Sequence, residues 1–284
     1  MRRLKGFEKR AWRERRKAMD IFVCIKQVPS TNKVQVDEKT GVLKRSGIQS
    51  KMNPYDLYAL ETALRLKARY GGTVTVGTMG PPQAQAIIRE AYMMGADDGY
   101  VFSDRRLGGA DVLATSYTLS QAIQSVGDFD LILCGKQTID GDTAQVGAEL
   151  AEFLGIPHVA GVSRIHELSG EEILLDLDLP LHVETVRVKL PCLVCVEKGI
   201  YEPRLPSFRR KLETAGRPVR TFTLDDMEDP APEHYGLSGS PTQVKRIFPP
   251  ENTNTHESWE GSGDELAERL RRLLDDRKFL QQLR

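Results

Sequence analysis

The sequence predicts an α/β protein whose mainly parallel sheet is covered by helices on both faces. Short, continuous apolar runs recur between residues 21 and 134, and such runs are typical of strands that are buried on both faces of a sheet. Longer amphipathic segments separate them, as helices do in right-handed strand–helix–strand units. After residue 159 the pattern predicts an antiparallel hairpin extension, and a polar segment near the C-terminus predicts an arm.

The first predicted strand is the apolar run over residues 21–25. Two short alternating stretches, 34–37 and 42–45, predict a hairpin before the first helix. That helix should begin at Asn53-Pro54, where an N-cap residue precedes proline at the first helical position, and should end at Gly71-Gly72. Its inner face is expected to carry Leu57, Leu60, Ala63 and Leu64.

The same alternation continues as far as Leu154. Further strands are predicted at 73–79, 100–102 and 130–134, and further helices at 83–94, 111–126 and 143–154. Gly155 and Pro157 should stop the last of these helices. Because strands that alternate with helices form parallel sheets, the predicted fold is Rossmann-like.

The alternation of predicted strands and helices ends after Val159. Three alternating stretches, 161–168, 171–179 and 182–190, predict antiparallel strands, and the apolar run 192–196 predicts one more buried strand. A loop rich in Pro, Arg and Lys is predicted at 199–218. The arm should extend over 225–263, and a helix with a stripe of leucines should follow at 264–280. Such an apolar stripe predicts a surface for a partner protein.

The composition is that of a globular protein, with 40% hydrophobic and 28% charged residues. The formal net charge of zero does not favour a nucleic acid partner, and no apolar run approaches the ~20 residues of a membrane span. We expect three regions. Residues 1–18 form a basic extension without a signal-peptide pattern, expected to be disordered; residues 19–224 form a nucleotide-binding α/β domain; and residues 225–284 form an arm and helix that pack on a partner.

No metal site and no catalytic residue are predicted. The cysteines, Cys24, Cys134, Cys192 and Cys195, all lie in apolar stretches, where thiols usually act as small hydrophobic groups. This cysteine usage fits a reducing cytoplasm. The five histidines show no ligand spacing, and no Ser/His/Asp or Cys/His arrangement can be recognised. The sequence therefore does not indicate a hydrolase or a metalloenzyme.

A ligand in this class of fold binds outside the carboxyl ends of parallel strands, where the strand order reverses. Three strand ends are unusual: residues 24–27, residues 78–81, where Gly80 allows close approach, and residues 135–147. In the last segment small residues keep the loop open, so backbone N–H groups could reach a phosphate at the start of the helix. Asp142 is a plausible N-cap that would occupy one or two of these groups. A nucleotide site and an ordinary capped helix therefore remain open alternatives, since neither a G-x-G-x-x-G nor a Walker A motif is present.

Six segments form a pattern when taken in this order: residues 23–28 (VCIKQV), 52–56 (MNPYD), 79–81 (MGP), 94–97 (MGAD), 135–147 (GKQTIDGDTAQVG) and 184–191 (ETVRVKLP). Together they resemble the electron-transfer flavoprotein β family. The resemblance extends from Asp20 to Leu280. One departure precedes the last segment, where the family usually has an acidic/glycine turn and this chain has residues 178–183 (DLPLHV).

The resemblance implies an electron-carrier subunit, not an enzyme by itself, that pairs with a flavin-carrying α subunit. In simpler members of the family the β subunit holds AMP, whereas in electron-bifurcating members it holds FAD that NADH reduces. Residues 140–147 resemble the bifurcating kind, so FAD is expected here and AMP is the alternative. The positions that match the family's nucleotide contacts are Cys24, Asn53, Pro54, Tyr55, Asp56, Met79, Gly135, Lys136, Gln137, Thr138, Ile139, Asp140, Gly141, Asp142, Thr143, Ala144, Gln145 and Val146.

Residues 197–212 match the family's recognition loop, which docks on acyl-CoA dehydrogenase-type partners. Ile200, Tyr201, Leu205 and Phe208 would be its apolar anchors, among Arg204, Arg209, Arg210 and Lys211. Without the resemblance, the composition of this segment favours a solvated basic loop. A more remote alternative is a stand-alone ATP-binding enzyme or sensor. It is disfavoured because residues 26–29 (KQVP) stand where an ATP-pyrophosphatase carries a Ser-Gly-Gly-type loop.

Overall fold

The computed structural model describes residues 18–30, 50–245 and 257–279 of the chain. These residues fall into two compact units, one that ends at Lys245 and one that begins at Arg246. The basic extension over 1–17 and the hairpin predicted at 34–45 lie outside the described residues.

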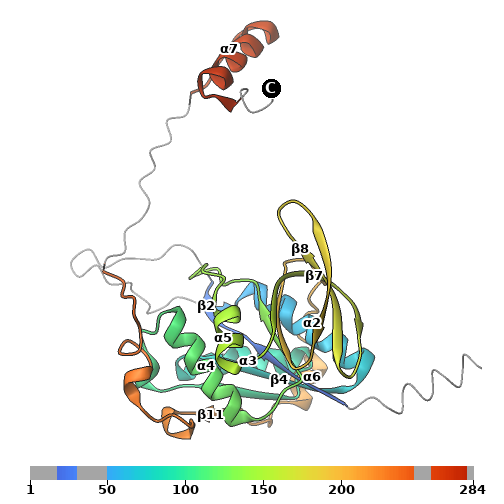
Figure 1. The fold of residues 1–284 in the computed structure, drawn as a ribbon, viewed down its shortest axis with the longest axis vertical. Helices are drawn as coiled ribbons and strands as arrows, with labels where there is room; N and C mark the ends of the chain where they lie inside the picture. Colours follow the sequence, from blue (N-terminus) through green and yellow to red (C-terminus); the bar gives the residue numbers. More distant parts are fainter. Residues whose placement is uncertain (1–17, 31–49, 246–256, 280–284) are drawn as a thin grey trace, which may run out of the picture. The chain divides into compact units, whose positions relative to one another are not determined.

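The first unit is built on a nine-stranded sheet with the order β11-β5-β4-β1-β6-β10-β7-β8-β9 (Figure 1). All pairs from β11 to β7 are parallel, and β7, β8 and β9 pair in antiparallel fashion. The strands are β1 (Met19–Cys24), β4 (Gly72–Met79), β5 (Asp98–Phe102), β6 (Leu131–Gly135), β7 (His158–Leu168), β8 (Glu172–Asp178), β9 (Val183–Lys189), β10 (Cys192–Val196) and β11 (Arg220–Phe222). The predicted α/β class with a mainly parallel sheet is confirmed.

Helices cover both faces of this sheet. They are α2 (Pro54–Tyr70), α3 (Gln85–Met94), α4 (Val112–Val126), α5 (Val146–Leu154) and α6 (Phe208–Glu213). Alternate residues of β1 belong to different layers of the core, because successive side chains of a strand point to opposite faces of the sheet. Ile21 and Val23 pack with α2 and α3, whereas Phe22 packs with α4 and α5.

The antiparallel extension is a regular hairpin. β8 and β9 pair without a break from Glu172 opposite Lys189 to Asp178 opposite Val183. The turn between them is closed by a hydrogen bond from the Leu179 N–H to the His182 carbonyl, 3.0 Å. The residues that depart from the family's usual turn therefore still form a tight reversal, and Figure 1 shows β7 and β8 extending beyond the helix-covered part of the sheet.

Three elements differ from the sequence predictions. α5 begins at Val146 and not at Thr143. The segment predicted as a loop over 199–218 contains α6, and β11 adds a short edge strand beside β5. The chain beyond residue 224 also continues to pack on the first unit. Met227 and Tyr235 are buried against α4, and the Tyr117 hydroxyl donates to the Asp229 carboxylate at 2.6 Å. The described unit thus ends about 20 residues beyond the boundary predicted after residue 224.

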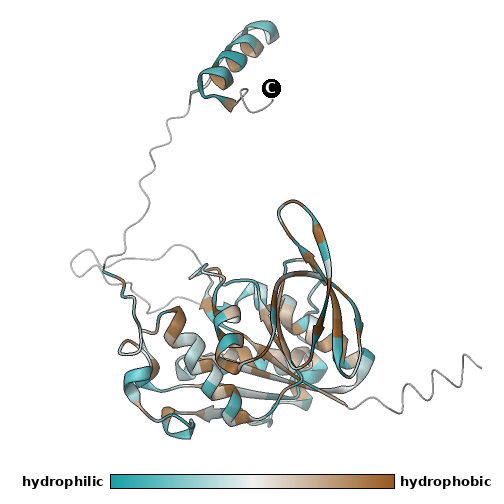
Figure 2. Ribbon diagram, in the orientation of Figure 1, coloured by the Kyte–Doolittle hydropathy of each residue, from teal (hydrophilic) through white to brown (hydrophobic). Residues whose placement is uncertain are grey.

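The second unit contains α7 (Gly263–Asp276). Its N-terminus has a capping box in which Ser262 and Glu265 satisfy each other's backbone N–H groups. Figure 2 shows both hydrophilic and hydrophobic residues on this helix. Its leucines include Leu270, 48% exposed, and Leu273, 38% exposed. An amphipathic helix that buries no residue within its own unit has an apolar face available for a further contact.

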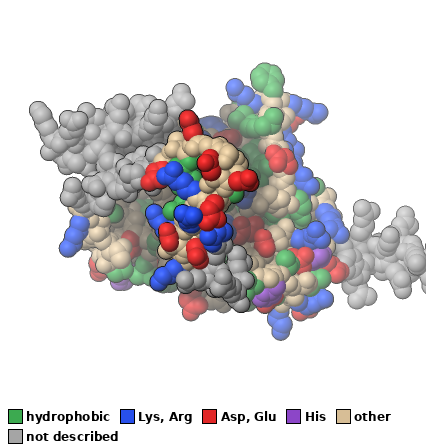
Figure 3. All heavy atoms as spheres, turned by 90° about the horizontal axis from the view of Figure 1, so that it is seen from above, with side chains coloured by type: hydrophobic (Ala, Val, Ile, Leu, Met, Phe, Trp, Pro, Cys, Tyr) green, Lys and Arg blue, Asp and Glu red, His purple; other side chains and the backbone are tan. Residues whose placement is uncertain are grey.

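On the face drawn in Figure 3, Lys and Arg side chains are interspersed with Asp and Glu side chains, in keeping with the zero formal net charge. Among the described helices, none combines the length and the apolar composition that a membrane span requires.

Candidate functional site

The strand order reverses beside β1. From β1 the chain passes to β4 and β5 on one side, and then to β6 and β10 on the other. The carboxyl ends of the three central strands are Cys24, Met79 and Gly135, and these strands are neighbours in the sheet. The three strand ends singled out from the sequence therefore lie together at the edge where this class of fold binds ligands.

Asn53 ties two of these strand ends together. It is fully buried, and its N–H donates to the Lys26 carbonyl at 2.8 Å. Its side-chain amide donates to the Gln137 carbonyl at 2.9 Å and accepts from the Ile139 N–H at 3.2 Å. The side chain makes no capping bond to α2, although the residue stands at the predicted N-cap position. Asn53 therefore fixes the loop after β6 relative to the end of β1.

Asp56 connects the same two strand ends through hydrogen bonds. Its buried carboxylate accepts from the Lys26 N–H at 2.7 Å and from the Gly135 N–H. Burial raises the pKa of Asp56 to about 7, against the lowering effect of hydrogen bonds from Asn53, Lys26 and Gly135. A Cβ at Gly135 would lie 2.6 Å from the Tyr55 carbonyl carbon, so only glycine allows the first turn of α2 to pack this closely.

The loop over residues 136–145 lies at the surface above these contacts. Lys26 pairs with Asp140 at 2.8 Å, and Lys136 pairs with Glu197 at 2.7 Å. Asp142 and Ala144 both have φ of 56°, a left-handed conformation that glycine and Asx residues adopt most easily and that is sterically costly for alanine. The loop is therefore shaped by bonds to other parts of the fold and by small side chains.

The interpretation of Asp142 as the N-cap of α5 is wrong. Its carboxylate accepts from the Gln137 side-chain amide, and the helix begins four residues later at Val146. Gln145 occupies the N-cap position and makes no side-chain bond to the helix. Within the described part of the chain, the positive end of α5 thus faces the site without a side-chain cap.

Gly147 and a row of thiols lie beneath the start of α5. A Cβ at Gly147 would lie 2.3 Å from Cys195 Sγ. Cys195 is paired with Cys134 in the sheet, and Cys134 also contacts Cys24. The hydrogen bond with Cys134 and then burial raise the pKa of Cys195. For Cys134, the bond from Cys195 acts to lower the pKa, but the bond to Cys24 and burial together raise it.

Cys134 and Cys195 are therefore protonated packing groups beneath the loop. All four cysteines are free thiols. Among the described residues, no group of three or more His, Cys, Asp or Glu side chains is arranged to hold a metal ion.

The predicted nucleotide contacts fall into two groups. The side chains of Asn53 and Asp56 are buried and hydrogen-bonded to backbone groups, so they support the loop from inside the fold. Cys24, Pro54, Tyr55, Met79 and Gly135 are half-buried at its floor, and most of residues 136–146 are exposed above it. Thr78 belongs to the second of the three strand ends but not to the predicted contacts. Its hydroxyl is buried at the end of β4 without a hydrogen-bond partner in the described chain, a signal that only packing reveals.

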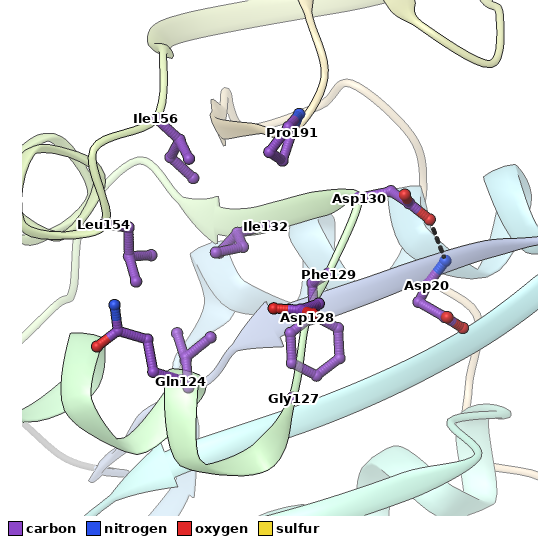
Figure 4. Close-up of a pocket in the computed structure, with 11 residues that line it drawn as sticks. Asp20, Gln124, Gly127, Asp128, Phe129, Asp130, Ile132, Leu154, Ile156 and Pro191 are labelled. Atoms are coloured by element: carbon purple, nitrogen blue, oxygen red, sulfur yellow. Dashed lines mark hydrogen bonds between the residues drawn. The ribbon is translucent and has the colours of Figure 1, made fainter. Parts of the chain in front are cut away.

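A separate pocket lies at the opposite edge of the sheet (Figure 4). It is lined by the start of β1, the ends of α4 and α5, and the residues that precede β6 and β10. Its polar groups include the carboxyl groups of Asp20, Asp128 and Asp130, and that of Asp130 accepts from the Asp20 N–H at 2.9 Å. Three acidic side chains at the amino ends of strands do not suit a phosphate ligand.

The recognition segment over 197–212 differs in part from its prediction. Leu205 and Phe208 are exposed, as apolar anchors should be, at 86% and 73%. Ile200 and Tyr201, in contrast, are half-buried, and Ile200 packs against the core. Leu212, which was not assigned as an anchor, is 65% exposed and lies one helical turn after Phe208.

Comparison with known proteins agrees with this geometry. Residues 40–227 match the family model "Electron transfer flavoprotein domain". The chain is 41% identical to the electron transfer flavoprotein subunit beta of Thermoanaerobacterium thermosaccharolyticum, over 92% of this chain and 100% of that protein. It is 44% identical to the caffeyl-CoA reductase-Etf complex subunit CarD of Acetobacterium woodii, over 82% and 88% of the two chains.

The subunit beta of Clostridium acetobutylicum is also 44% identical, over 80% of this chain and 87% of that protein. Coverage of this extent, together with the sheet order and the match to the family model, defines the family. The chain belongs to the electron transfer flavoprotein family as a β subunit, an electron carrier that pairs with an α subunit.

Proposed function

We propose that this β subunit holds FAD at the carboxyl ends of β1, β4 and β6. Paired with its α subunit, it would pass electrons from NADH to an acyl-CoA dehydrogenase-type flavoprotein and to a low-potential acceptor, which is flavin-based electron bifurcation. The observation that carries the proposal is the start of α5, which has no side-chain cap and opens over a loop of small residues at the point where the strand order reverses.

The residues that we assign to the cofactor are the expected ones: Cys24, 53–56, Met79 and 135–146. They suit a dinucleotide because the end of α5 carries about half a positive charge and N–H donors without a side-chain cap, both of which favour a diphosphate. Gly141 and Ala144 leave the approach open, and Lys26 adds a cation at the rim. Low side-chain bulk at Gly141 and Ala144 leaves room for a ligand longer than a mononucleotide.

The protein's own part in the function is to bind, orient and shield the cofactor. FAD would supply the electron-transfer chemistry itself. Asn53 and Asp56 would act indirectly, by holding Lys26, Gly135, Gln137 and Ile139 in the positions that shape the loop. The protonated thiols would add apolar packing beneath α5.

The names of relatives support the acceptor class. CarD is a subunit of a caffeyl-CoA reductase-Etf complex, and a protein of Anaerotignum propionicum that is 38% identical over 89% of this chain is called acryloyl-CoA reductase electron transfer subunit gamma. Both names link an electron-transfer subunit to the reduction of an unsaturated CoA ester. For this chain, the exposed Leu205 and Phe208 would form the contact with such a reductase.

The nucleotide content of the purified heterodimer tests the proposal. The two subunits are co-expressed, the complex is extracted with acid, and the released nucleotides are quantified by chromatography. We expect two FAD and no AMP per heterodimer, because the β site is assigned to FAD. One FAD with one AMP would replace the bifurcating function with the structural-AMP alternative. One FAD alone would contradict a nucleotide site in the β subunit.

A further inference from the structure

One buried carboxylate fastens the recognition segment to α2. Glu61 lies on α2 with only 2% of its surface exposed. It accepts three hydrogen bonds from Arg204: from the backbone N–H at 3.2 Å, from Nε at 2.7 Å and from Nη2 at 3.2 Å. It also accepts one from Arg65 Nε at 2.7 Å. Glu61 therefore holds both the backbone and the side chain of Arg204.

The electrostatics of this contact favour a fixed geometry. Burial raises the pKa of Glu61, but the hydrogen bonds from Arg204 and Arg65 outweigh burial and bring it below its ordinary value. The carboxylate is therefore charged, and both of its oxygens accept hydrogen bonds. Removing one partner of such a pair is costly, because the other partner then remains as a buried charge. The guanidinium carbon of Arg65 also lies 4.6 Å from the ring centre of Tyr201, so α2 contacts the segment at two points.

Contacts with α3 fix the other end of the segment. The Ser207 N–H donates to the Met93 carbonyl at 3.0 Å. Further along, Arg217 donates to the carbonyls of Ala96 and Asp97, and the Tyr92 hydroxyl donates to the Pro218 carbonyl. α6, which lies between these anchors, has six residues and is too short to be stable alone. Its conformation depends on the anchors on both sides.

The anchored segment presents its apolar residues outward. Leu205 directly follows the clamped Arg204, and Phe208 follows the Ser207 anchor. These two side chains and Leu212 are exposed, while Arg209, Arg210 and Lys211 lie beside them. Such an apolar surface with a basic border fits a partner whose apolar pocket has an acidic rim.

We infer that Glu61 is a positioning residue for partner docking: through Arg204 it holds residues 201–212 in the docking conformation before the partner arrives. This inference rests on the proposed docking function of that segment. A segment that is ordered in advance loses less conformational entropy on binding, so the clamp raises affinity without touching the partner.

Hydrogen exchange and binding measurements on the α–β heterodimer test the inference. Glu61→Gln keeps the shape of the side chain but removes its charge. We expect faster amide exchange in residues 201–212 and about tenfold weaker binding of butyryl-CoA dehydrogenase, the probe protein, since the segment must then be ordered on docking. The nucleotide content should match the wild type, because Glu61 does not contact the cofactor site.

Three further variants separate positioning from direct contact and from misfolding. Arg204→Gln, which changes the partly exposed member of the pair, should reproduce both effects, and combining it with Glu61→Gln should add little. Phe208→Ala should weaken binding without faster exchange elsewhere in the segment. Glu172→Gln removes an exposed ion pair with Arg187 and should change neither measurement.

The outcomes distinguish the inference from the function on which it rests. If the wild-type heterodimer binds the dehydrogenase, but Glu61→Gln and Arg204→Gln leave exchange and affinity within twofold of the wild type, the role of Glu61 is overturned. If the wild-type heterodimer does not bind the dehydrogenase, the docking function is overturned, and the role of Glu61 in docking is overturned with it.

Discussion

At the scale of single residues, the candidate site is shaped by side chains that hold backbone groups in place. Asn53 and Asp56 are buried, and each bridges backbone groups at the ends of β1 and β6. Gly135 and Gly147 allow α2 and α5 to approach the sheet more closely than a Cβ would permit. These residues belong to motifs that sequence reasoning assigned to the ligand, but their contacts make them supports of the loop.

Gly147→Ala tests the close approach of α5 to β10. The new Cβ would lie 2.3 Å from the buried Cys195 Sγ, and overpacking of this kind costs about 1–3 kcal/mol. We therefore expect a lower thermal unfolding midpoint of the heterodimer. Cys195→Ala in the same chain should recover part of the loss, because it removes the clashing sulfur. Gly170→Ala, where a Cβ meets nothing within 4 Å, is the matched control. Equal midpoints for Gly147→Ala and this control would refute the packing argument.

Asp56 should make stability depend on pH. Its pKa rises from 3.8 to about 7 on folding, so between these values the native state binds more protons than the unfolded state. The contribution of Asp56 to the free energy of unfolding is therefore present at low pH and is lost as the pH rises through about 7. The slope from one group is at most about 1.4 kcal/mol per pH unit.

Urea unfolding of the wild type and of Asp56→Asn across this pH range measures the effect. The difference between the two proteins should change steadily up to about pH 7 and then level off, because both states of the wild type are deprotonated at higher pH. A difference that does not vary with pH would show that Asp56 does not titrate in this range.

At the scale of elements, local signals predicted most of the fold. Pro54 at the start of α2 and Gly71 at its end mark the helix as expected, and the apolar runs mark β1, β4, β6 and β10. The errors occur where distant contacts decide the structure. α5 starts late because Lys26 and Asn53 hold the preceding loop, and both are remote in sequence. α6 and β11 have no periodic pattern of their own, so they depend on α2, α3 and β5.

The same distinction applies to the candidate site. Its place at the carboxyl ends of the strands followed from the alternation of strands and helices, and the sheet order agrees. The roles of its side chains could not be predicted, because burial decides them. The motif containing Asn53 and Asp56 gives no indication that both side chains are occupied by backbone groups.

The exposed leucines of α7 carry a prediction for assembly. We propose that this helix packs on the α subunit, since Leu270 and Leu273 have no buried contacts in the described chain. Leu270→Glu combined with Leu273→Glu should weaken α–β association at least tenfold, through the burial of charge at an apolar contact. Sedimentation or light scattering would measure this. Arg272→Ala, on the same helix, should have little effect, and equal weakening by both changes would contradict packing through the leucines.

At the scale of the whole molecule, the two edges of the sheet have different chemistry. The carboxyl edge combines an uncapped helix start with small residues, which favours an anion, and its Lys26 is paired with Asp140. The pocket at the amino edge has three carboxyl groups among apolar side chains, and these groups disfavour an anion. The recognition segment is anchored on α2 and α3, and its first residue, Glu197, pairs with Lys136 in the loop of the proposed cofactor site.

A crystal structure of the co-expressed heterodimer tests the central claim most directly, because it locates the nucleotide. The account predicts a dinucleotide at the carboxyl ends of β1 and β6, with diphosphate oxygens within hydrogen-bond distance of the N–H groups at the start of α5, Val146 and Gly147. If side chains of either subunit cap these groups instead, or if the nucleotide of the β subunit lies at another edge of the sheet, the account is contradicted.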